Sequence, residues 1–321
     1  MSSNQGAPAD GSGSGDGRRD QVRDMQGLLR LSIQHGTAEP ADPGAPMDDE
    51  RRQFLAAAMH HASSAITDTL RTALAALAET DTERQLAALR VLRDHVDQVD
   101  VANDFEKMGG LAAVQPLLAS ADGEIRAEAA GVLGDMVQNN PQCQRAALAA
   151  GLLPQLLKVV QADPEPVPRV TALQAVSGLL RHYPPAQAVF CAQDGCTALV
   201  SAMQSGQPRL QTKAAFLLGT VCSESGELRR RALDVGLIEQ VCGLLAAPHQ
   251  SWHEHLLAAL TVLAADGGRA AAECRRPELR LAQLLTVREQ ELKGLDEALE
   301  VLEHCRTLRQ LCFSAEDEGE R

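Results

Sequence analysis

Apolar residues recur at helical spacing along most of the chain, and glycine or proline interrupts them at a nearly constant interval. From Asp48 to Phe313 apolar side chains return every three or four residues, which predicts one helix after another. A long helix and then a short one precede each break. Successive breaks lie 41, 44, 41 and 41 residues apart, at Gly110, Gly151, Gly195, Gly236 and Pro277.

A period of 41–44 residues with two longer helices and one short helix is typical of an armadillo or HEAT solenoid. One such unit cannot cover its own apolar face, so it stacks on its neighbours. We therefore predict an all-α fold, an armadillo/HEAT-like α-solenoid of about five repeats. The repeats are predicted at 82–121, 122–162, 163–205, 206–247 and 248–289, with helical caps at 48–80 and 290–313. The alternative is a generic helical bundle whose glycines are evenly spaced by chance.

The two ends of the chain differ from this pattern. Residues 1–46 are rich in Gly, Ser, Pro and Asp and are predicted to be disordered, apart from a short amphipathic helix at 24–35. The solenoid is predicted to occupy 47–314. Residues 315–321 form an acidic tail.

Composition narrows the class of protein. Hydrophobic residues make up 45% of the 321 residues but aromatic residues only 2%, so Ala, Leu and Val carry the core, which disfavours an all-β fold. The net charge of −13 argues against a nucleic-acid partner, which requires a basic surface. The chain has neither a secretory signal nor an apolar stretch long enough for a membrane span. We expect a cytoplasmic monomer, with access to the nucleus left open.

Few residues suggest chemistry. The eight cysteines contain no CxxC pair, so scattered free thiols are favoured over a disulfide framework or a zinc site. His249, His253 and His255 invite a metal hypothesis, but His253 and His255 point to different sides of a helix and no third ligand is evident. No phosphate-binding glycine loop or nucleophile elbow occurs. We predict no metal, no cofactor and no enzymatic activity.

The long helix of each repeat resembles the concave helix of armadillo proteins. In the peptide-carrying members that helix bears a recurrent Asn, with a Trp four residues earlier. Here the Asn positions read Asp94, Asp135, Gly178, Thr220 and Val262. The Trp positions read Arg90, Gly131, Gln174, Phe216 and Ala258. The loss of both series disfavours an extended peptide as ligand, and the concave face is predicted to grip a folded protein instead.

Several segments together resemble one family of armadillo proteins. The chain is identified as similar to the Fes family, the nucleotide exchange factors of 70-kDa heat-shock chaperones. The resemblance spans about residues 24–314. The segments that carry it are 24–33, 47–55, 213–218, 253–255, 273–279 and 311–314, of which the two N-terminal segments and 274–279 are the most specific.

The resemblance implies a co-chaperone that wraps its concave face around the ATPase domain of the chaperone. It would open the nucleotide cleft, speed ADP release and so release substrate, and in excess it would inhibit refolding. The expected chaperone-binding residues are Arg169, Gln174, Lys213, Phe216, Glu254 and His255. Thr171 stands where relatives carry Lys, which removes one cation from this face. The alternative is a passive armadillo scaffold that joins other proteins in degradation or signalling.

Overall fold

The computed structural model describes residues 49–314, and every regular element in that range is helical. This confirms the all-α class. The predicted helix at 24–35, the predicted disorder of 1–46 and the acidic tail at 315–321 lie outside the described residues. By its internal contacts the chain divides into two compact units, 1–72 and 73–321. The described part of the first unit is helical throughout and belongs to α2 (Asp49–Leu77), whose last turn belongs to the second unit.

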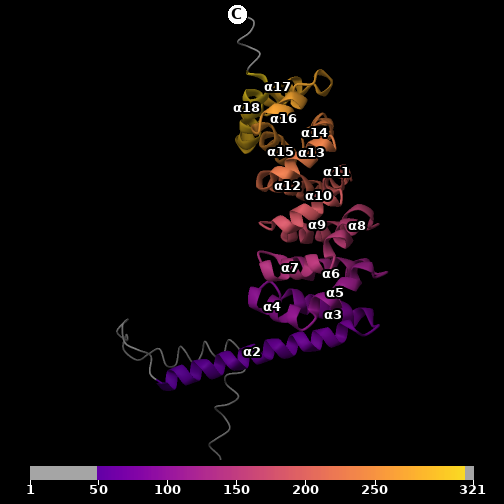
Figure 1. The fold of residues 1–321 in the computed structure, drawn as a ribbon, viewed down its shortest axis with the longest axis vertical. Helices are drawn as coiled ribbons and strands as arrows, with labels where there is room; N and C mark the ends of the chain where they lie inside the picture. The colour runs from indigo at the N-terminus through magenta and orange to yellow at the C-terminus, as the bar shows by residue number, and fades with distance from the viewer. Residues whose placement is uncertain (1–48, 315–321) are drawn as a thin grey trace, which may run out of the picture. The chain divides into compact units, whose positions relative to one another are not determined.

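The second unit is a continuous stack of short and long helices, which follow one another in order from α3 to α18 (Figure 1). Three short 3-10 segments interrupt them: η2 (Gln115–Ala119), η3 (Pro277–Leu279) and η4 (Asp296–Ala298). The α-helices are α3 (Thr82–Arg93), α4 (Val99–Lys107), α5 (Gly110–Val114), α6 (Gly123–Val137), α7 (Pro141–Ala149), α8 (Leu152–Ala162), α9 (Pro166–Leu180), α10 (Pro184–Ala192), α11 (Gly195–Met203), α12 (Pro208–Glu224), α13 (Gly226–Asp234), α14 (Leu237–Leu245), α15 (His253–Ala265), α16 (Gly268–Cys274), α17 (Leu281–Glu291) and α18 (Leu299–Phe313).

The long helices α3, α6, α9, α12, α15 and α18 pack against one another in sequence along the unit. Between two successive long helices lie two shorter α-helices, as in an armadillo-like solenoid. The first four predicted repeats each enclose one long α-helix and two shorter ones, whereas α17 runs past the predicted end of the fifth repeat at residue 289. The stack continues without interruption across the predicted limits. The exact repeat boundaries and the capping roles therefore stay predictions.

Each break in the helical pattern contains one residue in the left-handed region, but this residue is not always the glycine of the sequence pattern. Gly151 and Gly236 have φ of 68° and 69° and directly precede α8 and α14. Elsewhere the left-handed residue is Gly109 before α5, Asp194 before α11 and Arg280 before α17. The sequence pattern therefore placed these breaks one to three residues away from the residue that turns the chain.

Gly110 and Gly195 are required for a different reason, which is close packing. A Cβ at Gly110 would overlap the ring of Phe105, and a Cβ at Gly195 would overlap the ring of Phe190. Both rings are fully buried, and each lies five residues before its glycine. Two of the few aromatic residues thus fill the same position in the first and third predicted repeats.

Small residues let the long helices α6 and α9 approach closely. A Cβ at Gly134 would lie 3.2 Å from the Ala175 Cα atom, and one at Gly178 would lie 3.3 Å from a Val137 methyl group. Ala129, Ala130, Ala172 and Ala175 are fully buried in the same two helices. Because backbones this close leave no room for rings, the core is built from Ala, Leu and Val.

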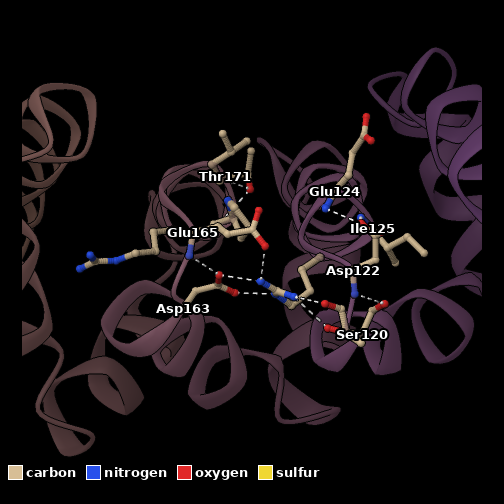
Figure 2. Close-up of polar contacts among 12 residues, drawn as sticks. Ser120, Asp122, Glu124, Ile125, Asp163, Glu165 and Thr171 are labelled. Carbon is tan, nitrogen blue, oxygen red and sulfur yellow. Dashed lines mark hydrogen bonds and ion pairs between the residues drawn. The ribbon is translucent and has the colours of Figure 1, made fainter. Parts of the chain in front are cut away.

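One buried ion pair joins the start of α6 to the turn before α9 (Figure 2). The Arg126 guanidinium donates from Nε and Nη2 to the two carboxylate oxygens of Asp163, at 2.6 and 2.8 Å. Its Nη1 donates to the Ser120 and Ala121 carbonyl oxygens at 3.0 and 3.1 Å, and Nη2 also reaches Glu165 at 3.2 Å. The Arg126 and Asp163 side chains are only 10% and 4% exposed, so the charges neutralise one another away from water.

Buried amides and another arginine satisfy carbonyl groups at helix ends. Gln144 of α7 donates to the Gly178 and Arg181 carbonyl oxygens at the end of α9. Gln187 of α10 donates to the Leu180 carbonyl oxygen, and Arg288 of α17 donates to that of Leu245. These bonds tie α7 and α10 to the long helix α9, and α17 to the end of α14.

All eight cysteines lie in the described range and are unpaired, and seven of them are buried, as the free-thiol prediction requires. Burial raises the pKa of Cys196 and Cys222 to about 12, as expected of thiols that pack as small apolar groups. No helix among residues 49–314 is long and apolar enough to cross a bilayer.

Replacing Asp163 by Asn should destabilise the fold by about 3 kcal/mol, because it leaves the Arg126 charge buried with weaker partners. Burial alone would raise the pKa of Asp163, but the bonds from Arg126 and from the Glu165 backbone hold it below its ordinary value. A carboxylate whose pKa is lowered by folding stabilises above its unfolded pKa, and the stabilisation disappears as the pH falls through its folded pKa. The D163N loss should therefore shrink below about pH 4.

Urea unfolding followed by circular dichroism measures this loss. Asp104→Asn is the matched control, because Asp104 pairs with Lys107 and both side chains are about 60% exposed. The control should change the free energy of unfolding by less than about 0.5 kcal/mol. Equal losses for D163N and D104N would contradict the role given to the buried pair.

Candidate protein-binding face

The six predicted binding residues lie on three consecutive long helices. Arg169 and Gln174 belong to α9, Lys213 and Phe216 to α12, and Glu254 and His255 to α15. Helix α12 packs against both α9 and α15. We call the solvent-facing side of the long helices α3, α6, α9, α12, α15 and α18 the ladder face.

Phe216 and His255 form the centre of the candidate site. The Phe216 side chain is 49% exposed. The chain has only five phenylalanines, and this one is not used in the core. Its ring meets the His255 ring edge to face, with centroids 5.6 Å apart and an interplanar angle of 75°. This pair links α12 to α15 and leaves an aromatic surface open to solvent. Half-exposed aromatic residues of this kind commonly anchor protein partners.

The other predicted residues differ in how free they are to meet a partner. Arg169 is half-buried, and its Nε donates to the Val160 carbonyl oxygen at 2.8 Å. That bond satisfies the C-terminal end of α8, so Arg169 has a structural task within the chain. Gln174 is exposed and Lys213 is half-buried. Lys213 and Phe216 lie three residues apart on α12, and therefore on one side of that helix.

Glu254 belongs to a second cluster, which the sequence analysis did not foresee. Its carboxyl group interacts with that of Glu300 on α18. Burial raises the pKa of Glu254, and so does Glu300, while His255 and His304 oppose the rise. Glu300 and His304 lie four residues apart in the segment predicted as a cap. That spacing was a usable signal, because it places both residues on one side of the helix.

At the N-terminal end of the ladder face the charged groups pair within the chain. Arg93 of α3 reaches across to α6, with its Nε 3.1 Å from an Asp135 carboxylate oxygen and its Nη1 3.2 Å from Glu128. A Cβ at Gly131 would lie 2.8 Å from the Arg93 Nε atom. Arg93 thus covers the position where peptide-carrying armadillo proteins have Trp, and Asp135 is bound where they have Asn.

The three histidines near the start of α15 do not converge on one point. His253 is fully buried, beside the Trp252 ring at 4.8 Å and the His249 ring at 5.8 Å, whereas His255 meets Phe216 on the ladder face. Within residues 49–314 no group of three or more His, Cys, Asp or Glu side chains could hold a metal ion.

Comparison with known proteins identifies the family. Residues 25–105 match the family model described as nucleotide exchange factor Fes1, and residues 101–205 match the SIL1/FES1/HPBP1 C-terminal domain. Hsp70-binding protein 1 of Mus musculus is 35% identical over 330 residues, covering 97% of this chain and 92% of the mouse protein. The chain belongs to the SIL1/FES1/HPBP1 family.

Other members of the SIL1/FES1/HPBP1 family match over shorter stretches. The nucleotide exchange factor SIL1 of Rattus norvegicus is 31% identical over 241 residues, covering 66% of this chain and 50% of the rat protein. The Hsp70 nucleotide exchange factor FES1 of Mycosarcoma maydis is 32% identical over 145 residues, covering 44% of this chain and 37% of its own length. The resemblance to the Fes family is therefore confirmed.

The solved structures that match include designed armadillo repeat proteins and engineered proteins. A designed armadillo repeat protein superimposes with a TM-score of 0.65 at 16% identity, covering 76% of this chain and 99% of the designed protein. An engineered protein gives a TM-score of 0.66 at 21% identity, with coverages of 76% and 98%. At such identities the likeness concerns the fold alone, and it confirms the armadillo-like solenoid.

Replacing His253 by Phe should make the free energy of unfolding depend less on pH below about pH 6.5. Burial lowers the pKa of His253 to about 4, and the positive charge of Arg288 and the His249 ring add to the effect. Both His253 ring nitrogens are buried without a hydrogen-bond partner, so the phenyl ring breaks no bond. Above about pH 6.5 the imidazole is neutral in both states; below it the unfolded chain takes up a proton that the folded chain refuses.

As the pH falls from 6.5 to 4, His253 should thus lower the free energy of unfolding by up to about 1.4 kcal/mol per pH unit. Urea midpoints measured at half-unit steps test this, with His182→Phe as the control because His182 is exposed. An unchanged slope in H253F would contradict the prediction.

Proposed function

We propose that this chain is a nucleotide exchange factor for 70-kDa heat-shock chaperones and that it performs no covalent chemistry of its own. The observation that carries the proposal is the match of residues 25–205 to two exchange-factor family models. Homologues that align with most of the chain are named Hsp70-binding protein 1, which supports the same partner. The ATPase domain as the bound part, a monomeric state and a cytoplasmic location with access to the nucleus belong to this proposal.

The ladder face between α9 and α15 is the surface we assign to the chaperone. Phe216 and His255 provide an aromatic centre, and the exposed Gln174 adds donors and acceptors beside it. Next to this aromatic centre, Lys213 supplies positive charge on α12, and Glu254 carries a carboxyl group on α15. An apolar centre with charged neighbours is the usual arrangement of a protein interface. Arg169 contributes by holding α8 to α9 rather than by direct contact.

Nucleotide exchange would follow from unequal affinities of the factor for the open and closed forms of the chaperone. A factor that binds the open form of the nucleotide cleft better than the closed form shifts the chaperone toward the open form. ADP favours the closed form, so ADP and the factor must weaken one another's binding by the same ratio. Release of ADP lets ATP enter and substrate leave, and excess factor would release substrate too early for refolding.

Stopped-flow release of fluorescently labelled ADP from a purified cytosolic 70-kDa chaperone tests the proposal. Saturating full-length protein should speed release at least about tenfold, since a coupling of about 1.4 kcal/mol suffices. Failure to accelerate release, with binding intact, would favour the passive scaffold. Failure to bind the chaperone at all would reject both the partner and the exchange role.

Lys213→Glu combined with Phe216→Ala should weaken chaperone binding at least about tenfold, because the pair removes the aromatic centre and reverses the adjacent charge. Lys158→Glu combined with Val99→Ala is the matched control. Lys158 is an exposed lysine on α8, and Val99 is a 47% exposed apolar residue on the short helix α4. Calorimetric titration gives the affinity, and helical circular dichroism verifies folding. Equal affinity of the two double variants for the chaperone would contradict the assignment of the ladder face as the binding surface.

A further inference from the structure

The middle of the ladder face is built from a positively charged part of the sequence, although the chain as a whole has a net charge of −13. Residues 166–223 have Asp194 as their only acidic residue. The same segment has four arginine and lysine residues: Arg169, Arg181, Arg209 and Lys213. It includes all of α9 and all but the last residue of α12. The surface that we assign to the chaperone is therefore opposite in sign to the net charge of the protein.

Two of these cations lie beside the aromatic centre. Arg209 and Lys213 come seven and three residues before Phe216 on α12, so all three share one side of the helix. Arg209 is exposed and Lys213 is half-buried. Within residues 49–314 neither side chain makes a hydrogen bond or an ion pair, whereas Arg169 is bound to the Val160 carbonyl oxygen. Arg209 and Lys213 are thus free to meet the charges of a partner.

The equivalent positions on α6 carry the opposite charge, and the chain compensates it. Glu124 and Glu128 of α6 have the spacing of the two α12 cations and lie two repeats earlier. Arg90 of α3 pairs with Glu124, and Arg93 pairs with Glu128 at 3.2 Å. Helix α9 cannot compensate α12 in the same way, because it contains no acidic residue. The positive charge of α12 is therefore left for a partner to neutralise.

We propose that the chaperone surface that docks on α12 is acidic and that Arg209 and Lys213 bind its carboxylate groups. The inference rests on the proposed exchange function and adds the chemistry that the partner must present. A guanidinium donates two parallel N–H bonds to one carboxylate, so Arg209 would fix the orientation of the bound group. Lys213 adds a compact charge one turn nearer to Phe216.

Apolar groups beside the two cations indicate a folded protein surface as the source of the carboxylates. Phe216 is 49% exposed, and Val167 on the neighbouring helix α9 is 60% exposed. In the register of the repeats, Val167 has the position on α9 that Arg209 has on α12. Mixed apolar and charged contacts are typical of protein interfaces, whereas a nucleic acid requires a longer run of cations.

Carboxyl groups on both sides of α9 and α12 would restrict where an acidic surface can bind. Glu124 and Glu128 lie on α6, and Glu254 and Glu300 lie on α15 and α18. Like charges that face one another across an interface weaken binding. An acidic surface displaced along the ladder face would lose the two cations and meet carboxyl groups instead. The charge pattern would thus set the register of the complex.

Arg209→Glu tests the inference by calorimetric titration of the full-length protein with a purified cytosolic 70-kDa chaperone. The affinity should fall at least about tenfold, because a cation that faces a carboxylate becomes a like charge. In about 1 M salt, where charges are screened beyond about 3 Å, most of this loss should disappear. Helical circular dichroism verifies folding.

Arg306→Glu is the matched control, because it changes the net charge by the same amount. Arg306 is exposed and, within the described part of the chain, makes no ion pair. It lies six residues after Glu300, and therefore on another side of α18. Its replacement should change the affinity by less than about twofold.

Cross-linking identifies the groups in contact. A water-soluble carbodiimide joins a lysine amine to a carboxylate as an amide, and the chain has only four lysines: Lys107, Lys158, Lys213 and Lys293. Digestion of the cross-linked complex should yield Lys213 joined to an Asp or Glu residue of the chaperone. Cross-links confined to the other three lysines, or no cross-link in a complex that forms, would overturn the inference.

The outcomes separate this inference from the exchange function. If the unmodified protein speeds ADP release but R209E and R306E bind the chaperone equally well, the exchange function stands and the acidic docking surface is wrong. If the unmodified protein does not bind the chaperone, both are rejected.

Discussion

The position of α9 relative to α6 depends on the charge pair between Arg126 and Asp163. Both side chains are almost fully buried, so neither charge can be compensated by water if the other moves. The guanidinium also holds the carbonyl groups of Ser120 and Ala121, which belong to the turn before α6. One side chain therefore fixes two successive inter-helix turns against each other. The close contact between α6 and α9, which tolerates only small residues such as Gly134 and Ala175, depends on that register.

A second ion-pair network decides which part of the ladder face is open. At α3 and α6, Arg93 joins Glu128 and Asp135, so three of the charged groups on that part of the face are paired with each other. From α9 onward no bond of this kind covers Phe216, whose ring remains half-exposed beside His255. The candidate surface thus lies at α9 to α15, where the Phe216 ring stays open, and not at α3 and α6, where the Arg93 ion pairs cover the face. The absence of Trp from its usual position on α6 has the same cause, because the Arg93 side chain occupies the space next to Gly131.

Much of the architecture could be predicted because it repeats. Helical periodicity and a constant break interval are local signals, and stacking of units that cannot bury their own apolar faces follows from them. At Gly110 and Gly195 the residue that turns the chain is not the glycine of the sequence pattern, because glycine has two uses. It permits left-handed backbone, but it also makes room for a ring such as Phe105, and the sequence alone does not distinguish these uses. In the second case the chain turns at a neighbour, Gly109 or Asp194.

The candidate site was harder to predict because it depends on contacts between repeats. The pairing of Phe216 with His255 and of Glu254 with Glu300 requires the register of α12, α15 and α18, which no single repeat encodes. Arg169 is a predicted binding residue, and its additional bond to the Val160 carbonyl oxygen is a contact that a residue pattern does not reveal. Periodicity gives the side of a helix on which a residue lies, and three-dimensional register decides what it meets there.

A face built on helices that are fixed in this way suits the proposed mechanism. Exchange requires a factor that distinguishes two forms of its partner, and its effect cannot exceed the difference between its two affinities. A flexible surface would adapt to both forms and lose that difference. The buried pair at Arg126, the close α6–α9 contact and the bonds from Gln144 and Arg288 to helix ends restrict such adaptation. The rigidity of the solenoid, rather than any reactive group, would then be the source of the coupling between partner shape and nucleotide release.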